Sequence, residues 1–213
     1  MEPIIQAVQS PYYGDAYYRK PPPDLSSLML KERIVYLGMP LAPSVAQLII
    51  AELLYLQYDD PEKPIKIYIN SRGEYPGLET SALAICDTIS YIKPPVHTIC
   101  IGAAVGMAAM ILASGTKGYR ASLPHAEIVL HETQGNARGQ ASDIQIEAQE
   151  VIATRKILVD ILARNTGQEP EKIRKDLDRV FYMTPQEAKE YGLIDRVFES
   201  QKDLATPLPV GAL

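Results

Sequence analysis

Three segments of this sequence follow apolar, strand-like runs and carry residues that can do chemistry. A histidine, His131, ends the run EIVL, the glycine-containing segment NSRGEYPG follows the strand-like IKIYI, and the small-residue segment GAAVGMAAM follows VHTICI. In open α/β sheets, functional groups lie at the carboxyl ends of the parallel strands. These three segments are therefore the candidate functional positions.

Each segment has both a chemical and a structural interpretation. The His131 imidazole can act as a general base, although a lone histidine at a strand end is more often a structural residue. Small residues let a helix N-terminus approach closely, which suits a nucleophile whose oxyanion is held by backbone amides. A glycine loop can present N–H groups to an oxygen or simply form a turn. From the residues alone both interpretations stay open.

Alternating strand and helix patterns supply the elements that position these segments. Strands are predicted at 33–37, 65–69 and 96–101, and helices at 45–58, 78–92 and from about 102 onward. A capping box formed by Ser44 and Gln47 is expected to begin the first of these helices. The repeated order of strand and helix implies right-handed βαβ crossovers and a largely parallel sheet.

A long helix is predicted over residues 139–167, ending at Gly167. Its apolar residues occupy more than one face: Ile144, Ile146, Val151, Ile152, Ile157, Leu158, Ile161 and Leu162. Either a partner chain covers part of this surface or the helix packs wholly within its own domain. Further along, Thr184 and Glu187 form a second capping signature, and Gly192 ends the short helix that it predicts.

Length and composition limit the classes of function. A chain of 213 residues buries one sizeable core, and its formal net charge of −5 argues against nucleic-acid or anionic-membrane partners. No apolar run has the length of a membrane helix, and no signal-peptide pattern opens the chain. Cys86 and Cys100 lack metal-site spacing and are expected to be small buried hydrophobes. We expect a cytoplasmic protein without metal or cofactor.

Many separate segments, in the right order, make the chain similar to ClpP, the proteolytic subunit of the ATP-dependent Clp protease, from Leu30 to about Phe198. The matching segments are LKERIVYL, PEKPIKIYINS, DTISYIKPPVHTICIG, LPH, HETQG, GQASDIQIEAQE, NTGQ and EAKEYGLID. The resemblance implies an α/β fold, a crotonase-like spiral of ββα units with a projecting strand-helix handle. It also implies two stacked seven-membered rings around a chamber, with handles that interleave between the rings.

The resemblance also implies how the chain is divided. Residues 1–26 form a Tyr- and Pro-rich segment that is expected to be extended, residues 27–200 form the ClpP-like domain, and residues 201–213 form a tail. The handle is expected at about 131–166.

The same resemblance implies a degenerate catalytic triad. Gly106 stands at the position of the serine nucleophile, His131 at the general base, and Val180 at the aspartate, directly after the ring-contact residue Arg179. In a Ser-His-Asp triad the serine supplies the attacking oxygen and the acid orients the histidine, so His131 alone has nothing to activate. We therefore expect an inactive homologue of a serine endopeptidase.

The region that corresponds to the oxyanion hole departs from the family as well. The family stretch S-P-G-G reads Ser71-Arg72-Gly73-Glu74 here, with about three extra residues after it, so Arg72 and Glu74 are expected to border the substrate groove. The oxyanion-hole-like positions are Gly73, Glu74 and Met107.

Two groups of residues could replace the missing acid or the missing nucleophile. Asp176 and Asp178 lie near the acid position, but neither fits it without a gap in the alignment. Ser71 and Ser142 are the alternative nucleophiles, although both are better explained as turn or capping residues. An active serine peptidase with an unrecognised nucleophile therefore stays as the alternative function, and acyl-CoA binding by a crotonase-like domain is a third.

These departures and the Tyr- and Pro-rich N-terminus resemble the ClpR-type subunits of cyanobacteria and plastids. That branch implies a non-catalytic subunit in mixed double-heptameric rings with active ClpP-type subunits, an AAA+ unfoldase such as ClpC or ClpX, and polypeptide substrates. The lack of a transit-peptide pattern favours a cyanobacterial cytoplasm over a plastid stroma. By position, the unfoldase-docking cleft would use Leu54, Tyr55, Lys66, Tyr68, Tyr91 and Phe198, with Lys66 where an aromatic residue is usual.

Overall fold

The structure, a computed structural model, describes residues 24–132, 137–200 and 203. Within these residues a seven-stranded sheet has the order β1-β2-β3-β4-β7, while β5 pairs with β3 and β6 pairs with β5. All of these pairings are parallel except that of β5 with β6. The strands are β1 (Ile34–Leu37), β2 (Ile65–Ser71), β3 (Val96–Val105), β4 (Arg120–Ser122), β5 (Glu127–Leu130), β6 (Phe181–Met183) and β7 (Arg196–Val197).

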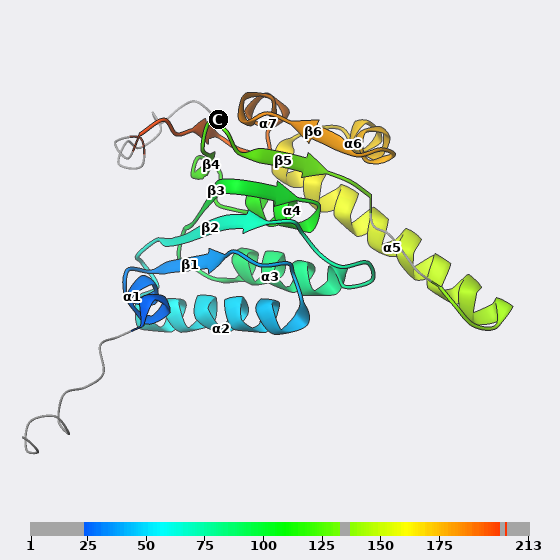
Figure 1. Cartoon of the computed structure of the whole chain (residues 1–213), viewed down its shortest axis with the longest axis horizontal. Helices are drawn as coiled ribbons and strands as arrows, with labels where there is room; N and C mark the ends of the chain where they lie inside the picture. The colour runs from blue at the N-terminus through cyan, green and yellow to red at the C-terminus, as the bar shows by residue number, and fades with distance from the viewer. Residues whose placement is uncertain (1–23, 133–136, 201–202, 204–213) are drawn as a thin grey trace, which may run out of the picture.

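The predicted alternation of strand and helix is confirmed in the order β1-α2-β2-α3-β3-α4. Helix α2 packs on α3, and α3 packs on α4, so these helices form a layer beside the parallel strands (Figure 1). The helices are α1 (Leu25–Lys31), α2 (Pro43–Asp59), α3 (Glu79–Tyr91), α4 (Met107–Ala113), α5 (Ala141–Thr166), α6 (Pro170–Leu177) and α7 (Pro185–Tyr191). The expected α/β fold is therefore present.

The predicted helix start near Gly102 is wrong. Strand β3 continues to Val105, and α4 begins only at Met107. The segment stays extended because its residues 103–105 pair with β5, whose residues 127–129 lie alongside. Small side chains are compatible with either element, so the long-range pairing decides between them.

The predicted capping box at Ser44 is also wrong. Helix α2 begins at Pro43, and its N-cap residue, Ala42, makes no side-chain hydrogen bond. Proline suits the first helical position because its fixed φ is already helical and its missing N–H would have no partner there.

The predicted ends of α5 and α7 are confirmed. Gly167 and Gly192 follow these helices with left-handed φ values of +77° and +94°. At Gly192 an added Cβ would lie 2.3 Å from the carbonyl oxygen of Thr166, so only glycine fits there. The capping box of Thr184 and Glu187 at the start of α7 is present in both directions.

The core lies between the parallel strands and the helix layer. In β2, Ile65, Ile67 and Ile69 are fully buried, whereas the residues between them are half-buried. Cys86 and Cys100 are buried as predicted, and burial raises their thiol pKa values to about 12 and about 11. Both thiols are therefore packing groups, not nucleophiles.

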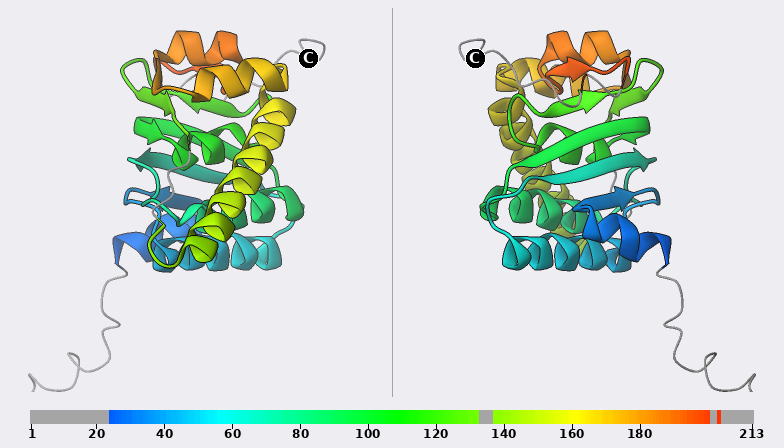
Figure 2. Two further views of the ribbon diagram at one scale, coloured as in Figure 1. Left: turned by 90° about the vertical axis from the view of Figure 1, so that its right-hand side faces the viewer. Right: turned by 90° about the vertical axis from the view of Figure 1, so that its left-hand side faces the viewer.

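Helix α5 projects from the body of the domain in Figure 1, and the left view of Figure 2 shows it running diagonally in front of the sheet. Only its C-terminal part is buried, through Leu158, Val159 and Leu162. The remaining part exposes four isoleucine side chains, namely Ile144, Ile146, Ile152 and Ile157. The apolar surface predicted on more than one face of this helix is thus not covered within the described chain.

Helix α1 begins at Leu25, so regular structure starts slightly before the expected end of the N-terminal segment at residue 26. Residues 1–23, and all of the 201–213 tail except Asp203, lie outside the described residues. Among the described helices, none has the length and apolar character needed to span a lipid bilayer.

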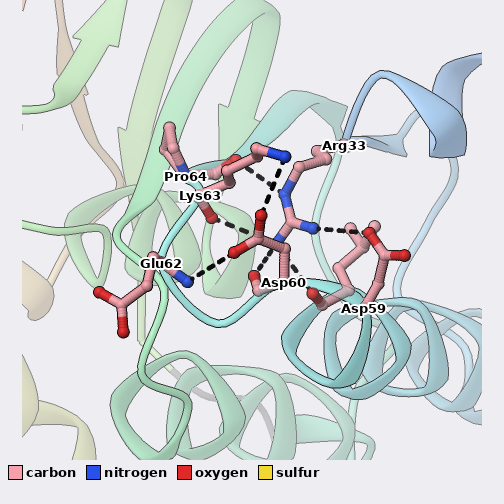
Figure 3. A network of polar contacts seen from close by, with 7 residues as sticks. Arg33, Asp59, Asp60, Glu62, Lys63 and Pro64 are labelled. Atoms are coloured by element: carbon pink, nitrogen blue, oxygen red, sulfur yellow. Dashed lines mark hydrogen bonds and ion pairs between the residues drawn. The ribbon is translucent and has the colours of Figure 1, made fainter.

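Arg33 joins the start of β1 to the end of α2 (Figure 3). It is 8% exposed and has a φ of +59°, which is unusual for a residue with a side chain. Its guanidinium forms an ion pair with Asp59 at 3.1 Å and donates to the carbonyl oxygens of Leu56, Asp60, Lys63 and Pro64. It therefore satisfies carbonyl groups at the C-terminal end of α2 and in the turn before β2.

We expect Arg33→Met to lower the free energy of unfolding by about 2–3 kcal/mol, because several charge-assisted hydrogen bonds are lost together. Urea-induced unfolding of the purified chain measures this. Arg174→Met, which breaks an exposed pair with Glu171, is the matched control and should change stability by less than about 1 kcal/mol. Equal effects of the two substitutions would show that the Arg33 network does not stabilise the fold.

Candidate functional site

The candidate residues from all three segments meet at the carboxyl ends of the parallel strands. Gly106 lies between β3 and α4, His131 follows β5, and Glu74 lies in the loop after β2. Val180 directly precedes β6, the neighbour of β5. The topology thus brings together positions that lie far apart in the sequence, from Glu74 to Val180.

Gly106 occupies a sharp turn from strand to helix. Its φ of +56° and ψ of −119° would be strained for a residue with a side chain, and such strain is typical of nucleophile elbows. Its amide donates to the carbonyl oxygen of Val129 at 2.9 Å, which fixes the turn against β5. The backbone therefore has the shape of an elbow that presents a nucleophile, but the side chain is absent.

The imidazole of His131 faces this turn. A Cβ added to Gly106 would lie 2.4 Å from His131 Nε2 and 3.1 Å from Glu74 Oε2. His131 Nδ1 lies 2.9 Å from the carbonyl oxygen of Glu132. With its proton on Nδ1, the ring donates to this carbonyl, and the basic Nε2 is directed at Gly106, where there is no hydroxyl to deprotonate.

Val180 directly precedes β6, and His131 directly follows β5. In the antiparallel pairing of β5 with β6, Leu130 is opposite Phe181, and one further step of the same register sets His131 opposite Val180. Directly opposed residues on adjacent strands have their side chains on the same face, within contact distance. We therefore expect the position that the resemblance assigns to the acid to lie near His131, and it holds an exposed apolar side chain.

The two nearby aspartates have other partners. Asp176 accepts a hydrogen bond from the hydroxyl of Tyr191 at 2.9 Å, and Asp178 accepts one from Arg155 at 2.7 Å. Burial raises the pKa of the Tyr191 hydroxyl, and Asp176 raises it further, so this phenol stays a donor. Neither carboxylate orients His131, which agrees with the ungapped alignment.

Arg155 is the residue of this region that sequence reasoning missed. Besides Asp178, it forms an ion pair at 2.9 Å with Glu132, the residue after His131. It ties the long helix α5 to both the histidine segment and the segment before Val180. In the sequence it is one of many charges on α5, and no local pattern sets it apart.

Both candidate oxyanion donors already have acceptors within the chain. The Met107 amide donates to Glu74 Oε2 at 2.9 Å, and the Gly73 amide donates to Ser71 Oγ at 3.2 Å. Gly73 has a φ of +88°, and an added Cβ would lie 2.5 Å from the Val105 carbonyl oxygen, so glycine is required there. The sequence predicts that Glu74 borders the substrate groove. In the structure its carboxylate also accepts a hydrogen bond from the Met107 amide.

The alternative nucleophiles are placed as structural residues. Ser71 is 2% exposed, and its hydroxyl donates to the carbonyl oxygen of Met39 at 2.7 Å. Ser142 is exposed in the first turn of α5. These positions favour the turn and helix-start interpretations of both serines.

A small pocket opens beside Gly106, between α4 and α5. Its lining is mainly apolar, with Arg155 and Glu132 among the polar members; the other lining residues are Met107, Met110, Leu130, His131, Leu158, Leu162 and Leu177. Arg72, on the loop after β2, pairs with Glu127 at 3.6 Å on the surface. Within the described ranges, no three histidine, cysteine, aspartate or glutamate side chains gather as a metal site would require.

The predicted docking residues lie on strand β2, on helices α2 and α3, and after β7. Tyr68 and Phe198 join one apolar cluster with Ile99, Ala121 and Ile101, and Lys66 lies half-buried on the same strand as Tyr68. Leu54 and Tyr55 on α2, and Tyr91 on α3, are exposed. Arg179 is exposed just before Val180.

Comparisons with known proteins show which family the chain resembles. The family model described as Clp protease matches residues 21–201. An ATP-dependent Clp protease proteolytic subunit-like protein of Synechococcus elongatus is 62% identical, over 96% of this chain and 97% of that protein. ATP-dependent Clp protease proteolytic subunit 2 of Gloeobacter violaceus is 53% identical over 97% of this chain and 94% of its own length.

A plant relative shares the domain but is longer. The chloroplastic ATP-dependent Clp protease proteolytic subunit-related protein 4 of Arabidopsis thaliana is 44% identical over 90% of this chain and 65% of that protein. The family match over most of the chain, the two near-full-length relatives and the α/β fold lead to one conclusion: this protein belongs to the Clp protease family.

Proposed function

We propose that this chain is a non-catalytic, ClpR-type subunit of a Clp protease core, which takes positions in a mixed ring with active ClpP-type subunits. One observation carries the proposal. At the turn where an active subunit needs a hydroxyl, the chain has Gly106, and the basic nitrogen of His131 faces it with nothing to activate. Loss of a triad nucleophile lowers turnover by about 10⁶-fold in a serine protease.

The surroundings of Gly106 support an inactive site. Val180 stands where the resemblance places the acid, and the carboxylates of Asp176 and Asp178 are engaged by Tyr191 and Arg155. Relatives in Arabidopsis carry the name subunit-related, which fits a branch whose members differ from proteolytic subunits.

The proposed contribution of the chain is structural. The exposed isoleucines of α5 supply an apolar surface for a neighbouring ring, and the cluster around Tyr68 and Phe198 supplies a surface for an AAA+ unfoldase. Lys66 beside Tyr68 places a positive charge there, which would favour an unfoldase loop with an acidic residue. Polypeptide substrates would be cut by the active subunits of the same chamber, in a cyanobacterial cytoplasm or a plastid stroma.

We expect native mass spectrometry to detect this chain in rings of fixed ratio when it is expressed with active ClpP-type paralogues from its own genome. In the same preparation, a serine-directed fluorophosphonate should label the paralogues and leave this chain unmodified. Ile152→Glu, on the exposed face of α5, should weaken the stacking of rings, whereas Ile152→Leu should not. Labelling of this chain, or rings built from this chain alone, would contradict the proposal.

A further inference from the structure

Glu74 reaches across the candidate site from a different segment of the chain. It lies in the loop between β2 and α3, and its Oε2 accepts a hydrogen bond at 2.9 Å from the amide of Met107, the first residue of α4. The same oxygen is 3.1 Å from the point where a Cβ of residue 106 would stand, and His131 Nε2 is 2.4 Å from that point. The carboxylate therefore occupies the space between the amide and the vacant nucleophile position.

An oxygen at this position lies where the oxyanion of an acyl-transfer intermediate would be bound. In acyl transfer, the oxyanion of the tetrahedral intermediate must lie about 2.7–3.1 Å from backbone N–H donors beside the nucleophile. The Glu74 carboxylate is itself an oxyanion, and it meets the Met107 donor at such a distance. The second candidate donor, the Gly73 amide, is engaged by the hydroxyl of Ser71.

We propose that the Glu74 carboxylate is an intramolecular occupant of the oxyanion position and closes this site to peptide carbonyl groups. The proposal rests on the non-catalytic role proposed above and deepens it. The closure is independent of the missing serine and aspartate, since it acts on the donor and not on the nucleophile. Repairing the triad alone therefore leaves the site closed.

A purely structural role for Glu74 makes a different prediction. Helix α4 has no side-chain cap of its own, because its N-cap residue is Gly106, so the Glu74 contact also caps this helix. Removal of a cap would lower stability without opening a binding position. A readout that depends on an accessible donor, and not on stability, separates the two roles.

The test uses the full chain, assembled with its active paralogues, in a background with Gly106→Ser and Val180→Asp. The probe is a biotinylated fluorophosphonate, whose phosphoryl oxygen needs the same donors, and the readout is the labelling rate of Ser at position 106 by intact mass. We expect Glu74→Ala to increase this rate by about 10²–10³-fold, the usual worth of one oxyanion donor. Glu74→Gln should stay closed, because its amide oxygen still accepts from Met107.

Glu79→Ala is the matched control. Glu79 lies in the same region and accepts from the Gly77 amide, not from Met107. Its removal should leave the labelling rate unchanged. If Glu74→Ala labels no faster than its parent, or if Glu74→Gln or Glu79→Ala labels as fast as Glu74→Ala, the proposal is overturned.

A second measurement needs no engineered triad. In the otherwise unchanged chain, hydrogen exchange of the Met107 amide should become faster with Glu74→Ala and stay slow with Glu79→Ala. Unchanged exchange would overturn the contact on which the proposal depends. Neither experiment bears on ring incorporation of the unaltered chain, so a failure here is distinguishable from a failure of the proposed function.

Discussion

Adding Val180→Asp to a chain that already carries Gly106→Ser and Glu74→Ala is expected to raise its peptidase turnover by about 10⁴-fold. This is the cost of removing the orienting acid from a serine protease triad. If the register of β5 and β6 is continued by one residue, position 180 pairs with His131, so we expect a carboxylate there to accept from Nδ1. At present Nδ1 contacts only the Glu132 carbonyl oxygen in the described structure, and that group carries no full charge to stabilise an imidazolium.

The serine itself requires a small adjustment. Because an added Cβ at position 106 would lie 2.4 Å from His131 Nε2, the imidazole must withdraw before a hydroxyl can stand between them. An acid at position 180 holds the ring from its other side and so favours the withdrawn arrangement. Gly106→Ser alone is therefore expected to give very little activity.

Turnover of a fluorogenic peptide ester measures the effect. Val180→Asn is the matched control, because asparagine has the size of aspartate but lacks its charge, and it should remain near the activity of the valine parent. Strong activity without an acid at position 180 would show that the assignment of Val180 to the acid position is wrong.

The second large effect is expected on stability. Arg120 is 4% exposed, and its guanidinium binds both carboxylate oxygens of Asp195 at 2.7 and 3.0 Å. It also donates to the carbonyl oxygens of Ala113 and Asn165, which lie in α4 and α5. Arg120→Met should lower the free energy of unfolding by about 3 kcal/mol, because it leaves the partly buried carboxylate of Asp195, whose side chain is 14% exposed, without its counter-ion.

Chemical denaturation compares this loss with that of Lys93→Met, which removes an exposed pair with Glu62. The exposed pair should contribute less than about 1 kcal/mol. A similar small loss for Arg120→Met would mean that the buried network is not important for stability.

The same pair predicts a dependence of stability on pH. Burial by itself would raise the pKa of Asp195, but the hydrogen bonds and charge of Arg120 and the Gly118 amide lower it overall from its ordinary value of 3.8. A carboxyl group with a lowered folded-state pKa stabilises the fold above its unfolded pKa, and this contribution disappears as the pH falls through the folded value. In Asp195→Asn, the part of the acid-induced loss of stability below about pH 4 that belongs to this group should be absent.

The order of the elements could be predicted from the sequence, since apolar periodicity and glycine stops are local signals. They located the strand-helix alternation, the end of α5 at Gly167 and the box at Thr184 and Glu187. The local pattern does not predict the structure of the segment after Ile101, because small residues suit a strand and a helix equally well. Only its pairing with β5 keeps it extended as far as Val105.

Some features of the candidate site likewise follow from the sequence, and others depend on the tertiary structure. That position 106 has no hydroxyl and position 180 no carboxylate follows from the sequence alone, because no fold can restore a missing functional group. The contact between Glu74 and Met107, by contrast, joins residues 33 positions apart, and Arg155 meets Asp178 across 23 positions. Such contacts depend on how the strands and helices are packed, which no local pattern encodes. Only the tertiary structure therefore decided that the amide beside Gly106 is engaged by a carboxylate of the same chain.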